Sequence, residues 1–494
     1  MSEPCPVIAD PREGRATALF LLALAAYFAA QVLLRVVLGG SLEGDEAEMV
    51  VLAREWHFTF GSQPPLYNWY QTLVFDLVGV STLGVVLAKN VLLFATYLLT
   101  FLAFRPVAGT RLAMIGALSL ALIPNLAWWA QRTGSHSIAL AALTAGTVLV
   151  FLRLLGRPGT GAFLLFGLVV GLGGLAKPNY WLVPPALVLA GLSMAAYRPI
   201  LLDRRLWLSA GVALAVIALP YAVMLAAPMA TFSDVWEFQK GASGGGAARW
   251  PLGLGHMLGS GVVELVPAAL AIGIALAFGR RVRGALFQPQ PQEALLLRAA
   301  LIGVGLVAGG VVLADVAFVR ARWMLPLFML GIPPLFMALF RTASAPARRG
   351  FVLGIAGLAL LLLSAIADTR LRGAGSDSLR IDLLADAIAR EVPDMPPLIG
   401  PHYYTGNLLL LRPGWEAFPP FPTHLLAEPS GRVLVIGESG SARETLRALK
   451  EHGYPGDALP EPALTGKAVL PYRFTTGDTR TIRFTLYDFG RPEP

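Results

Sequence analysis

The chain has 494 residues, of which 55% are hydrophobic and only 14% are charged, with a net charge of +8 and a mean hydropathy of +0.63. Ordinary soluble domains carry roughly 25% charged residues, and a surface this apolar aggregates in water. The composition therefore excludes an ordinary soluble enzyme and a disordered chain. It also excludes a disulfide scaffold, because the single cysteine, Cys5, can form no bridge within the chain.

Eleven apolar runs are long enough to predict membrane-spanning helices, which need about 20 mostly apolar residues. They lie at roughly 17–38, 81–104, 111–130, 135–153, 161–176, 180–197, 207–228, 258–279, 297–315, 323–340 and 350–367. The first run follows a basic segment, and we expect a retained signal anchor because no clear cleavage site follows it.

The distribution of basic residues predicts the orientation of these spans. With the N-terminus inside, the inner loops hold 16 Lys and Arg residues and the outer loops hold seven. The positive-inside rule therefore predicts a cytoplasmic N-terminus. Because eleven is odd, the C-terminal region is expected outside, in the periplasm of a bacterium with this protein in its inner membrane. The positive excess is thus a topology signal and indicates no nucleic-acid partner.

The composition changes near residue 368. Residues 1–367 carry 25 Lys and Arg against 15 Asp and Glu, whereas residues 368–494 carry 14 against 16. The second part has the size of one soluble domain. Residues 431–454 predict a strand, a turn and an amphipathic helix, and residues 479–489 alternate as a strand does. These patterns predict a small α/β domain, which we expect to serve as a lid or an acceptor-docking module.

The loop 39–80, expected on the outer face, contains a cluster of four acids between residues 43 and 48. Loops of this length between spans are usually functional. Asp45 is predicted to cap a helix that begins at Glu46. Apolar side chains then recur at helical spacing over residues 49–57, which predicts an amphipathic helix lying at the membrane interface. A carboxylate held here can act as a general base, and a simple helix cap is the alternative interpretation.

A second helix is predicted after Pro64 and Pro65, with proline in its first turn. Tyr67 and Trp69 follow within this segment. Aromatic residues close to a bilayer surface are typical of the interfacial belt, so both are expected at that level.

The Asp45-Glu46 pair, followed about 20 residues later by QPPLYNW at 63–69, resembles the GT-C membrane glycosyltransferases. The segment is most similar to bacterial relatives of the protein O-mannosyltransferases and of the lipid A aminoarabinose transferase. The resemblance covers about 35–180 well and the later spans loosely. It implies transfer of a sugar from a polyprenyl-phosphate donor at the extracytoplasmic face, with inversion at the anomeric carbon. It also implies no cofactor and no required divalent metal.

The resemblance assigns roles residue by residue. Asp45 falls on the catalytic Asp of the family, and Glu46 is the acid beside it. Lys177, at the end of GLGGLAKPNY, falls on a Lys implicated in holding the donor phosphate. The motif residues expected at the substrate are Gln63, Pro64, Pro65, Tyr67 and Trp69.

Two departures argue against aminoarabinose as the donor sugar. The aminoarabinose transferases have Glu-Lys before the two prolines, where this chain has Ser62 and Gln63. They also carry an Arg three residues after the catalytic Asp, where this chain has Glu48. Two cationic phosphate contacts are therefore absent, and the wider family allows other pyranoses.

A phosphate leaving group needs positive charge where it gains negative charge. The outer face offers four such cations, among which Arg suits bidentate contacts and Lys acts as a point charge. These are Lys177, Arg132, Arg320 and Arg322. Arg322 precedes a Trp before a late span, as in the family, and so ranks above Arg320. Binding of ordinary lipid headgroups is the alternative for Arg132 and Arg320.

Two polar residues lie within predicted spans. Lys89 is a functional candidate because an intramembrane Lys is costly, and it is expected to contact substrate unless it snorkels to the surface. His136, near the outer end of its span, is expected to bind substrate, with a hydrogen bond to a backbone carbonyl as the alternative. The outer loop 229–257 has a Gly-rich centre flanked by Trp236, Phe238 and Trp250, and it is predicted to close over the donor as a lid, with a plain interfacial loop as the alternative.

The sequence as a whole predicts a polytopic α-helical membrane protein of the GT-C type with about 11 spans. Residues 1–367 form the catalytic part and residues 368–494 a small periplasmic α/β domain. The predicted reaction moves a sugar from a polyprenyl-phosphate donor to an envelope acceptor, which is lipid A, a glycan or a protein. One alternative is a transporter or flippase of lipid-linked sugars, which would show inverted repeats and broken helices. Another is a non-catalytic envelope assembly protein, which would tolerate loss of Asp45.

Overall fold

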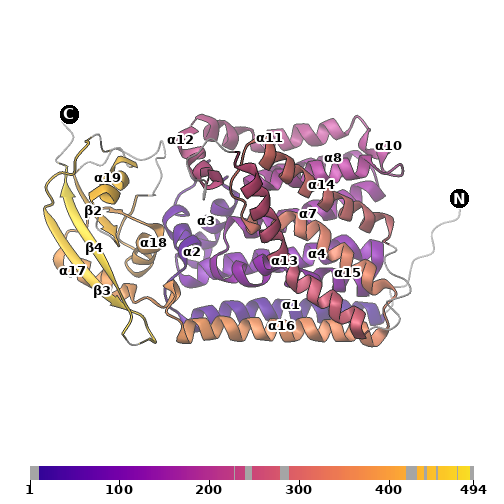
Figure 1. Ribbon diagram of the computed structural model, residues 1–494, viewed down its shortest axis with the longest axis horizontal. Coiled ribbons are helices and arrows are strands. Elements are labelled where there is room, and N and C mark those ends of the chain that lie inside the picture. The colour runs from indigo at the N-terminus through magenta and orange to yellow at the C-terminus, as the bar shows by residue number, and fades with distance from the viewer. Residues whose placement is uncertain are drawn as a thin grey trace.

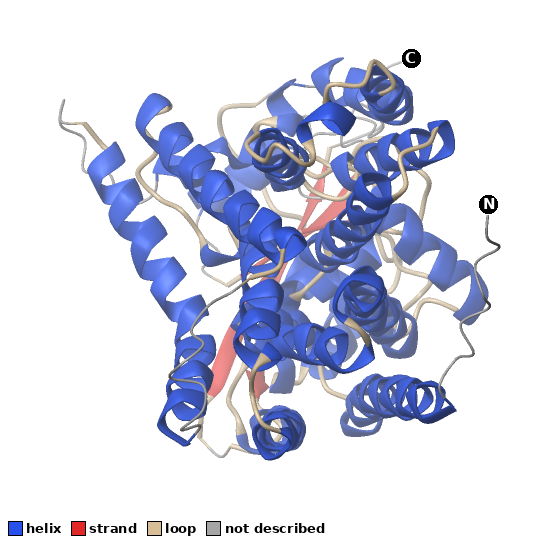
Figure 2. Cartoon of the chain, turned by 90° about the vertical axis from the view of Figure 1, so that its right-hand side faces the viewer, coloured by secondary structure: helices blue, strands red, loops and turns tan. Residues whose placement is uncertain are grey.

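The computed structural model describes residues 11–226, 228–239, 248–278, 289–418, 431–438, 442–451, 454, 456–475 and 477–489. A bundle of helices forms one end of the molecule, and a small sheet with its own helices forms the other (Figure 1). The start of α1 at Pro11 lies at the end of the bundle that is farthest from the sheet (Figure 1). Viewed from that end, many of the helices are seen along their axes, and the strands lie behind them (Figure 2).

Seven helices of the described residues are long and apolar enough to cross a membrane. They are α1 (Pro11–Leu38), α4 (Thr82–Ala108), α7 (His136–Gly156), α11 (Leu206–Ala226), α13 (Trp250–Phe278), α14 (Pro291–Leu313) and α16 (Ala345–Arg372). An eighth candidate span is broken by a bend of 79°. It comprises α5 (Thr110–Leu118) with η1 (Ser119–Leu122), then the π-helical η2 (Asn125–Trp129) with α6 (Ala130–Thr133).

The remaining predicted runs form shorter elements. They are α8 (Thr160–Gly174), η3 (Pro178–Leu182) with α9 (Val183–Leu192), and α15 (Leu325–Arg341). Short helical segments connect the larger ones: α10 (Arg198–Leu201), α12 (Pro228–Thr231), η4 (Ser233–Gln239) and η6 (Ala321–Trp323). All eleven predicted runs therefore overlap helical structure, although their lengths vary more than the hydropathy pattern indicates.

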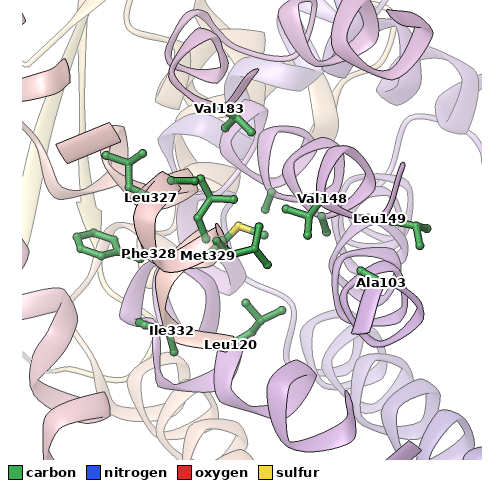
Figure 3. Packing of buried hydrophobic residues seen from close by; sticks show 14 of the residues in the cluster. Ala103, Leu120, Val148, Leu149, Val183, Leu327, Phe328, Met329 and Ile332 are labelled. Atoms are coloured by element: carbon green, nitrogen blue, oxygen red, sulfur yellow. The ribbon is translucent and has the colours of Figure 1, made fainter. Parts of the chain in front are cut away.

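The core of the bundle is apolar and built from helices that are distant in sequence. Figure 3 shows side chains of α4, η1, α7, α9 and α15 meeting in one cluster. Helices in lipid associate through close packing, which small residues permit. At the crossing of α8 and α11, a Cβ on Gly167 would lie 2.3 Å from the carbonyl oxygen of Ser209, so only glycine fits there.

The C-terminal part is an α/β domain, as the sequence predicted. Its elements are η7 (Ser376–Ser378), α17 (Ile381–Glu391), β1 (Leu398–Ile399), α18 (His402–Leu411), β2 (Arg432–Gly437), α19 (Ala442–Glu451), β3 (Leu464–Pro471) and β4 (Thr479–Asp488). The strand order is β1-β2-β4-β3. β1 pairs with β2 in parallel, and β4 is antiparallel to both β2 and β3. The predicted strand-turn-helix is β2 followed by α19, and the alternating segment is β4.

Two short helices, α2 (Gly44–Leu52) and α3 (Leu66–Val78), lie between the bundle and the sheet domain (Figure 1). The predicted start of α2 is wrong, because the helix begins at Gly44 and its N-cap is Glu43. The Glu46 carboxylate accepts a hydrogen bond from the backbone N–H of Glu43, at 3.2 Å, as in a capping box. Asp45 is therefore not the N-cap of α2.

The predicted interfacial helix over residues 49–57 is also wrong. α2 ends at Leu52, and most of its side chains are buried, including those of Met49 and Val50. The reason is that α18 of the C-terminal domain packs on α2, so the helix is enclosed by protein. The second predicted helix is α3, which starts at Leu66, directly after Pro65.

Candidate active site

A small pocket lies beside the start of α2. Asp45 of α2 and Arg322 of η6 contribute its charged groups. The other lining residues come mainly from η2, α6 and the start of α7: Asn125, Leu126, Trp129, Ala130, Thr133, Gly134, Ser137, Ile138 and Leu325. The pocket thus forms where the broken span, η6 and α2 meet.

Asp45 is half-buried at the second position of α2, with its Oδ2 3.7 Å from Nη1 of Arg322. Burial raises the pKa of Asp45, and the positive charges of Arg322 and Lys177 partly oppose this shift. A raised pKa makes the carboxylate a better proton acceptor than an ordinary aspartate. At 3.7 Å the ion pair is too long for a hydrogen bond, so both groups keep capacity for other partners.

Lys177 reaches the same pocket from the turn between α8 and η3. Its Nζ donates a hydrogen bond of 2.7 Å to Oγ of Ser137, which lines the pocket. Burial and the neighbouring Arg322 lower the pKa of Lys177 to about 7, although the charge of Asp45 opposes the change. The structure therefore brings Asp45, Lys177 and Arg322 together, as the sequence predicted for a carboxylate and two phosphate-binding cations.

Backbone contacts fix the two segments that carry these cations. The N–H of Leu66, just after the two prolines, donates to the carbonyl of Leu175 at 3.0 Å. The side-chain amide of Asn179 donates to the carbonyl of Trp323 at 2.8 Å. The Pro-Pro-Leu motif, the Lys177 turn and the Arg322 turn are therefore tied to one another.

Glu46 points away from the pocket and into the bundle. Its Oε1 lies 2.5 Å from Nζ of Lys89, and its Oε2 lies 3.5 Å from Nη2 of Arg35. Burial favours the neutral acid, but Lys89 and Arg35 outweigh it and lower the pKa of Glu46 to about 2. Lys89 also donates to the carbonyl of Gln131 at 2.7 Å. The alternative that Lys89 snorkels to the surface is wrong, because its side chain is 1% exposed; its contact with substrate stays a prediction.

Arg132 and Arg320 each have an acidic partner. Nη2 of Arg132 lies 3.0 Å from Oε1 of Glu43, and its guanidinium also lies over the rings of Trp128 and Trp129. Arg320 forms an ion pair with Glu237. Neither arginine lines the Asp45 pocket, and a phosphate role for them stays a prediction.

The motif residues lie behind the pocket and do not line it. Pro64, Pro65 and Tyr67 are buried, so the predicted interfacial position of Tyr67 is wrong. The reason is that α3 folds back on α7, where the Tyr67 ring lies 5.4 Å from that of His136. The substrate role of these residues stays a prediction.

The remaining polar residues of this region bind one another. Nε2 of His136 contacts Oδ1 of Asn68 at 2.7 Å, so the expected carbonyl partner is replaced by a side-chain amide. The Trp69 indole donates to the carbonyl of His57 at 2.6 Å. Nε2 of Gln63 donates to Oγ of Ser62 at 3.2 Å. These contacts stabilise the loop, and direct substrate contacts for its members stay predictions.

The centre of the predicted lid, residues 240–247, and the side chain of Trp236 lie outside the described residues. The flank is described, and the ring of Phe238 lies 5.1 Å from that of Trp323, next to Arg322. The backbone carbonyl of Phe238 also accepts hydrogen bonds from the N–H groups of Ala317 and Phe318. The flank is thus anchored beside the pocket.

Sequence reasoning missed Asn125 and Ser137 in the pocket wall, and Glu264 behind it. Glu264 of α13 is 1% exposed. Its two carboxylate oxygens accept from the side-chain amide of Asn125 at 2.6 Å and from its backbone N–H at 3.1 Å. An acid inside an apolar run was the available signal for Glu264. Ser137 carries no such signal, because single serines are common in membrane helices.

The fold and the site together define a membrane-embedded helix bundle with a carboxylate and neighbouring cations at the end beside the sheet domain. Residues 62–223 match the family described as dolichyl-phosphate-mannose-protein mannosyltransferase. The fold resembles that of ArnT from Cupriavidus metallidurans in a crystal structure with bound undecaprenyl phosphate. The TM-score is 0.60 at 14% identity, over 95% of this chain and 97% of that chain.

Two curated relatives extend the likeness to the sequence. The chain is 32% identical to the lipopolysaccharide core galacturonosyltransferase RgtA of Rhizobium johnstonii, over 96% of this chain and 97% of RgtA. It is 35% identical to RgtB of the same organism, over 64% of each chain. The chain therefore belongs to this family of GT-C membrane glycosyltransferases. The predicted fold class and glycosyltransferase activity are confirmed, and the chain is a multi-pass membrane enzyme for sugar transfer to an envelope acceptor.

Proposed function

We propose that the chain transfers galacturonic acid from a polyprenyl-phosphate donor to the lipopolysaccharide core, with inversion at the anomeric carbon. The sugar and the acceptor follow the names of RgtA and RgtB. The residues that replace the aminoarabinose transferase contacts, Ser62, Gln63 and Glu48, favour a different donor sugar. A lipid-linked donor fits a pocket at the end of a membrane bundle.

One observation supports the mechanism above all others: Asp45 and Arg322 line one pocket, and Lys177 donates a hydrogen bond to Ser137 in its wall. In the proposed reaction, an acceptor hydroxyl attacks the anomeric carbon while Asp45 takes its proton. The bond between that carbon and the phosphate oxygen breaks, and polyprenyl phosphate leaves with the bonding electrons. Arg322 and Lys177 stabilise the charge that develops on the leaving oxygen. Attack from the side opposite the leaving group inverts the configuration at the anomeric carbon.

The proposal includes no divalent metal and no other cofactor. Arg322 and Lys177 supply, at the leaving oxygen, the positive charge that a metal ion provides in other transferases. The long contact between Arg322 and Asp45 leaves the guanidinium able to turn towards a phosphate. Binding of the donor then also frees Asp45 for the acceptor hydroxyl.

We further propose an inner-membrane location with a cytoplasmic N-terminus and a periplasmic C-terminal domain. The start of α1 and the sheet domain lie at opposite ends of the bundle (Figure 1). The excess of basic loops at the N-terminal side supports this orientation. A cysteine introduced at residue 467 of β3 is then expected to react with an impermeant thiol reagent from the periplasm only, and cytoplasmic labelling would contradict the orientation.

The deciding experiment presents the purified protein with polyprenyl-phosphate-linked galacturonic acid, aminoarabinose, mannose and galactose, each with lipopolysaccharide core acceptors. Mass spectrometry of the acceptor is expected to show a galacturonic acid adduct. Asp45→Asn is expected to reduce its rate of formation by about 10²- to 10⁴-fold, and Asp76→Asn, at an exposed acid of α3, is the matched control. Transfer of another sugar in place of galacturonic acid would overturn the donor assignment, and full activity of Asp45→Asn would overturn the role of Asp45.

A further inference from the structure

α18 of the C-terminal domain lies directly on α2, the helix that carries Asp45 (Figure 1). The contact is so close that a Cβ on Gly406 would lie 2.0 Å from the carbonyl oxygen of Ala47. Side chains at this point of α18 would push the two helices apart, so glycine is required. The position of α2 is therefore set in part by a helix that follows it by about 350 residues.

Asn407, the next residue of α18, binds the backbone that leads into α2. Its Oδ1 accepts from the N–H of Leu42 at 2.7 Å, and its Nδ2 donates to the carbonyl of Leu42 at 3.0 Å. Leu42 is fully buried, and Asn407 is 2% exposed. Leu42 precedes the N-cap, so helix α2 cannot satisfy its N–H. A buried backbone group without a partner is costly, and the Asn407 amide satisfies both groups at once.

A second set of contacts comes from the segment that joins α16 to the sheet domain. The N–H of Ser41 donates to the carbonyl of Asp377 at 3.0 Å, and Oγ of Ser41 donates to the carbonyl of Leu379 at 2.7 Å. Oγ of Ser376 donates to Oε2 of Glu43, the N-cap of α2, at 2.6 Å. Residues 41–43 are thus held on two sides by the C-terminal part of the chain.

We propose that Asn407 is a positioning residue for the transfer reaction. By fixing Leu42, three residues before Asp45, it sets where the Asp45 carboxylate lies relative to the acceptor. The C-terminal domain is then a structural part of the active site as well as a candidate docking module. This inference rests on the proposed function, because it takes Asp45 as the reacting carboxylate.

The two cations are mounted on other elements, and this makes the inference testable. Lys177 lies in the α8–η3 turn and Arg322 in η6, and both turns are tied to each other through Asn179 and Trp323. Loss of Asn407 is therefore expected to displace Asp45 while donor binding persists. The kinetic signature is a fall in kcat with little change in the KM for the donor.

The experiment compares Asn407→Leu, which keeps the branched side-chain shape but removes the hydrogen bonds, with Asn407→Asp, which keeps the acceptor oxygen. We expect kcat to fall roughly 10- to 100-fold for Asn407→Leu, as for an ångström-scale misplacement, and less for Asn407→Asp. The donor KM is expected to stay within about threefold, as for an interaction that acts mainly in the transition state. The control is Arg412→Ala at the end of α18, whose ion pair with Asp386 is exposed; its kcat is expected to match wild type.

Hydrogen exchange supplies a second readout that does not depend on sugar transfer. Asn407→Leu is expected to accelerate exchange at residues 41–47 and to leave α7 protected. If that variant does not fold, Asn407→Asp carries the same comparison. Wild-type kcat in a variant with loosened residues 41–47, or equal losses of α7 protection and donor affinity, would overturn the inference. Absence of transfer by the wild type with every donor would instead count against the proposed function, and exchange would still report whether Asn407 holds α2.

Discussion

The pocket at Asp45 and the buried cluster at Glu46 are neighbouring regions that use charge in opposite ways. The two acids are adjacent in sequence, but successive residues of an α-helix point about 100° apart. Asp45 faces the pocket, where it makes a 3.7 Å ion pair with Arg322 and both side chains are about a third exposed. Glu46 faces the bundle, where Lys89 and Arg35 surround it.

This difference separates a reactive carboxylate from a structural one. In the Glu46 cluster, Arg35 also donates to the carbonyls of Gly39 and Ser41, at 2.6 and 3.0 Å. The cluster thus ties α1 and α4 to the loop before α2, and its charges are already satisfied. A carboxylate can accept a proton from substrate only if its charge is not engaged in this way, which is the condition that Asp45 meets.

The largest effect is expected from removing the Asp45 charge. Asp45→Asn is expected to lower kcat by about 10²- to 10⁴-fold, the usual contribution of a general base, with unchanged thermal stability. Glu46→Gln is expected to lower thermal stability, because Lys89 loses its anionic partner. Initial rates and thermal unfolding in detergent distinguish the two variants. A Glu46→Gln enzyme that is stable but inactive would show that the assignment of the two acids is reversed.

The next test removes a cationic partner of Glu46, the Lys89 side chain. Lys89→Met leaves the buried Glu46 carboxylate with Arg35 as its remaining cationic partner. Removing one partner of a buried ion pair typically lowers the free energy of unfolding by about 3–5 kcal/mol. The double variant Glu46→Gln/Lys89→Met removes both charges and is expected to recover much of this loss. Thermal unfolding of the single and double variants measures the recovery. If Lys89→Met keeps its stability and only raises the donor KM, Lys89 contacts substrate instead.

The sequence predicted the helical runs and the α/β domain, because hydropathy and strand patterns carry those signals. Its motifs also singled out Asp45, Lys177 and Arg322, whose roles stay predictions. It did not predict which acid caps α2, since four acids within six positions all suit a helix start. It also placed α2 at a lipid interface, because the covering helix α18 is distant in the chain and an apolar face looks the same against protein and lipid.

The same limit applies to the four outer cations. Counting them from the sequence gives no information about their partners, which come from distant segments. Glu43 engages Arg132, and Glu237 engages Arg320. Contacts in the folded chain show that Arg322 lines the Asp45 pocket and that Lys177 binds Ser137 in its wall.

A matched pair of arginines tests this distinction. Arg322→Ala is expected to lower kcat by about 10²- to 10³-fold, as for the loss of one preorganised donor at a developing negative charge. It is also expected to move the acidic limb of the rate profile to higher pH, because the Arg322 charge lowers the Asp45 pKa. Arg320→Ala, two residues away, loses an arginine that Glu237 already engages and is expected to show a much smaller effect. Equal losses in both variants would contradict a special role for Arg322.

The smallest expected effect concerns the dependence of kcat/KM on pH above pH 7. Burial and Arg322 lower the pKa of Lys177 to about 7, so its charge is present below that pH and is lost as the pH rises. A charged donor binds an anion better than a neutral one by about 1.5 kcal/mol, so kcat/KM for the donor is expected to fall about tenfold above pH 7. The ionised fraction of Asp45 can only increase as the pH rises, so Asp45 does not cause the fall. In the Lys177→Arg variant the side chain keeps its charge at every accessible pH, so the fall of kcat/KM above pH 7 is expected to disappear. If the fall persists in that variant, a group other than Lys177 causes it.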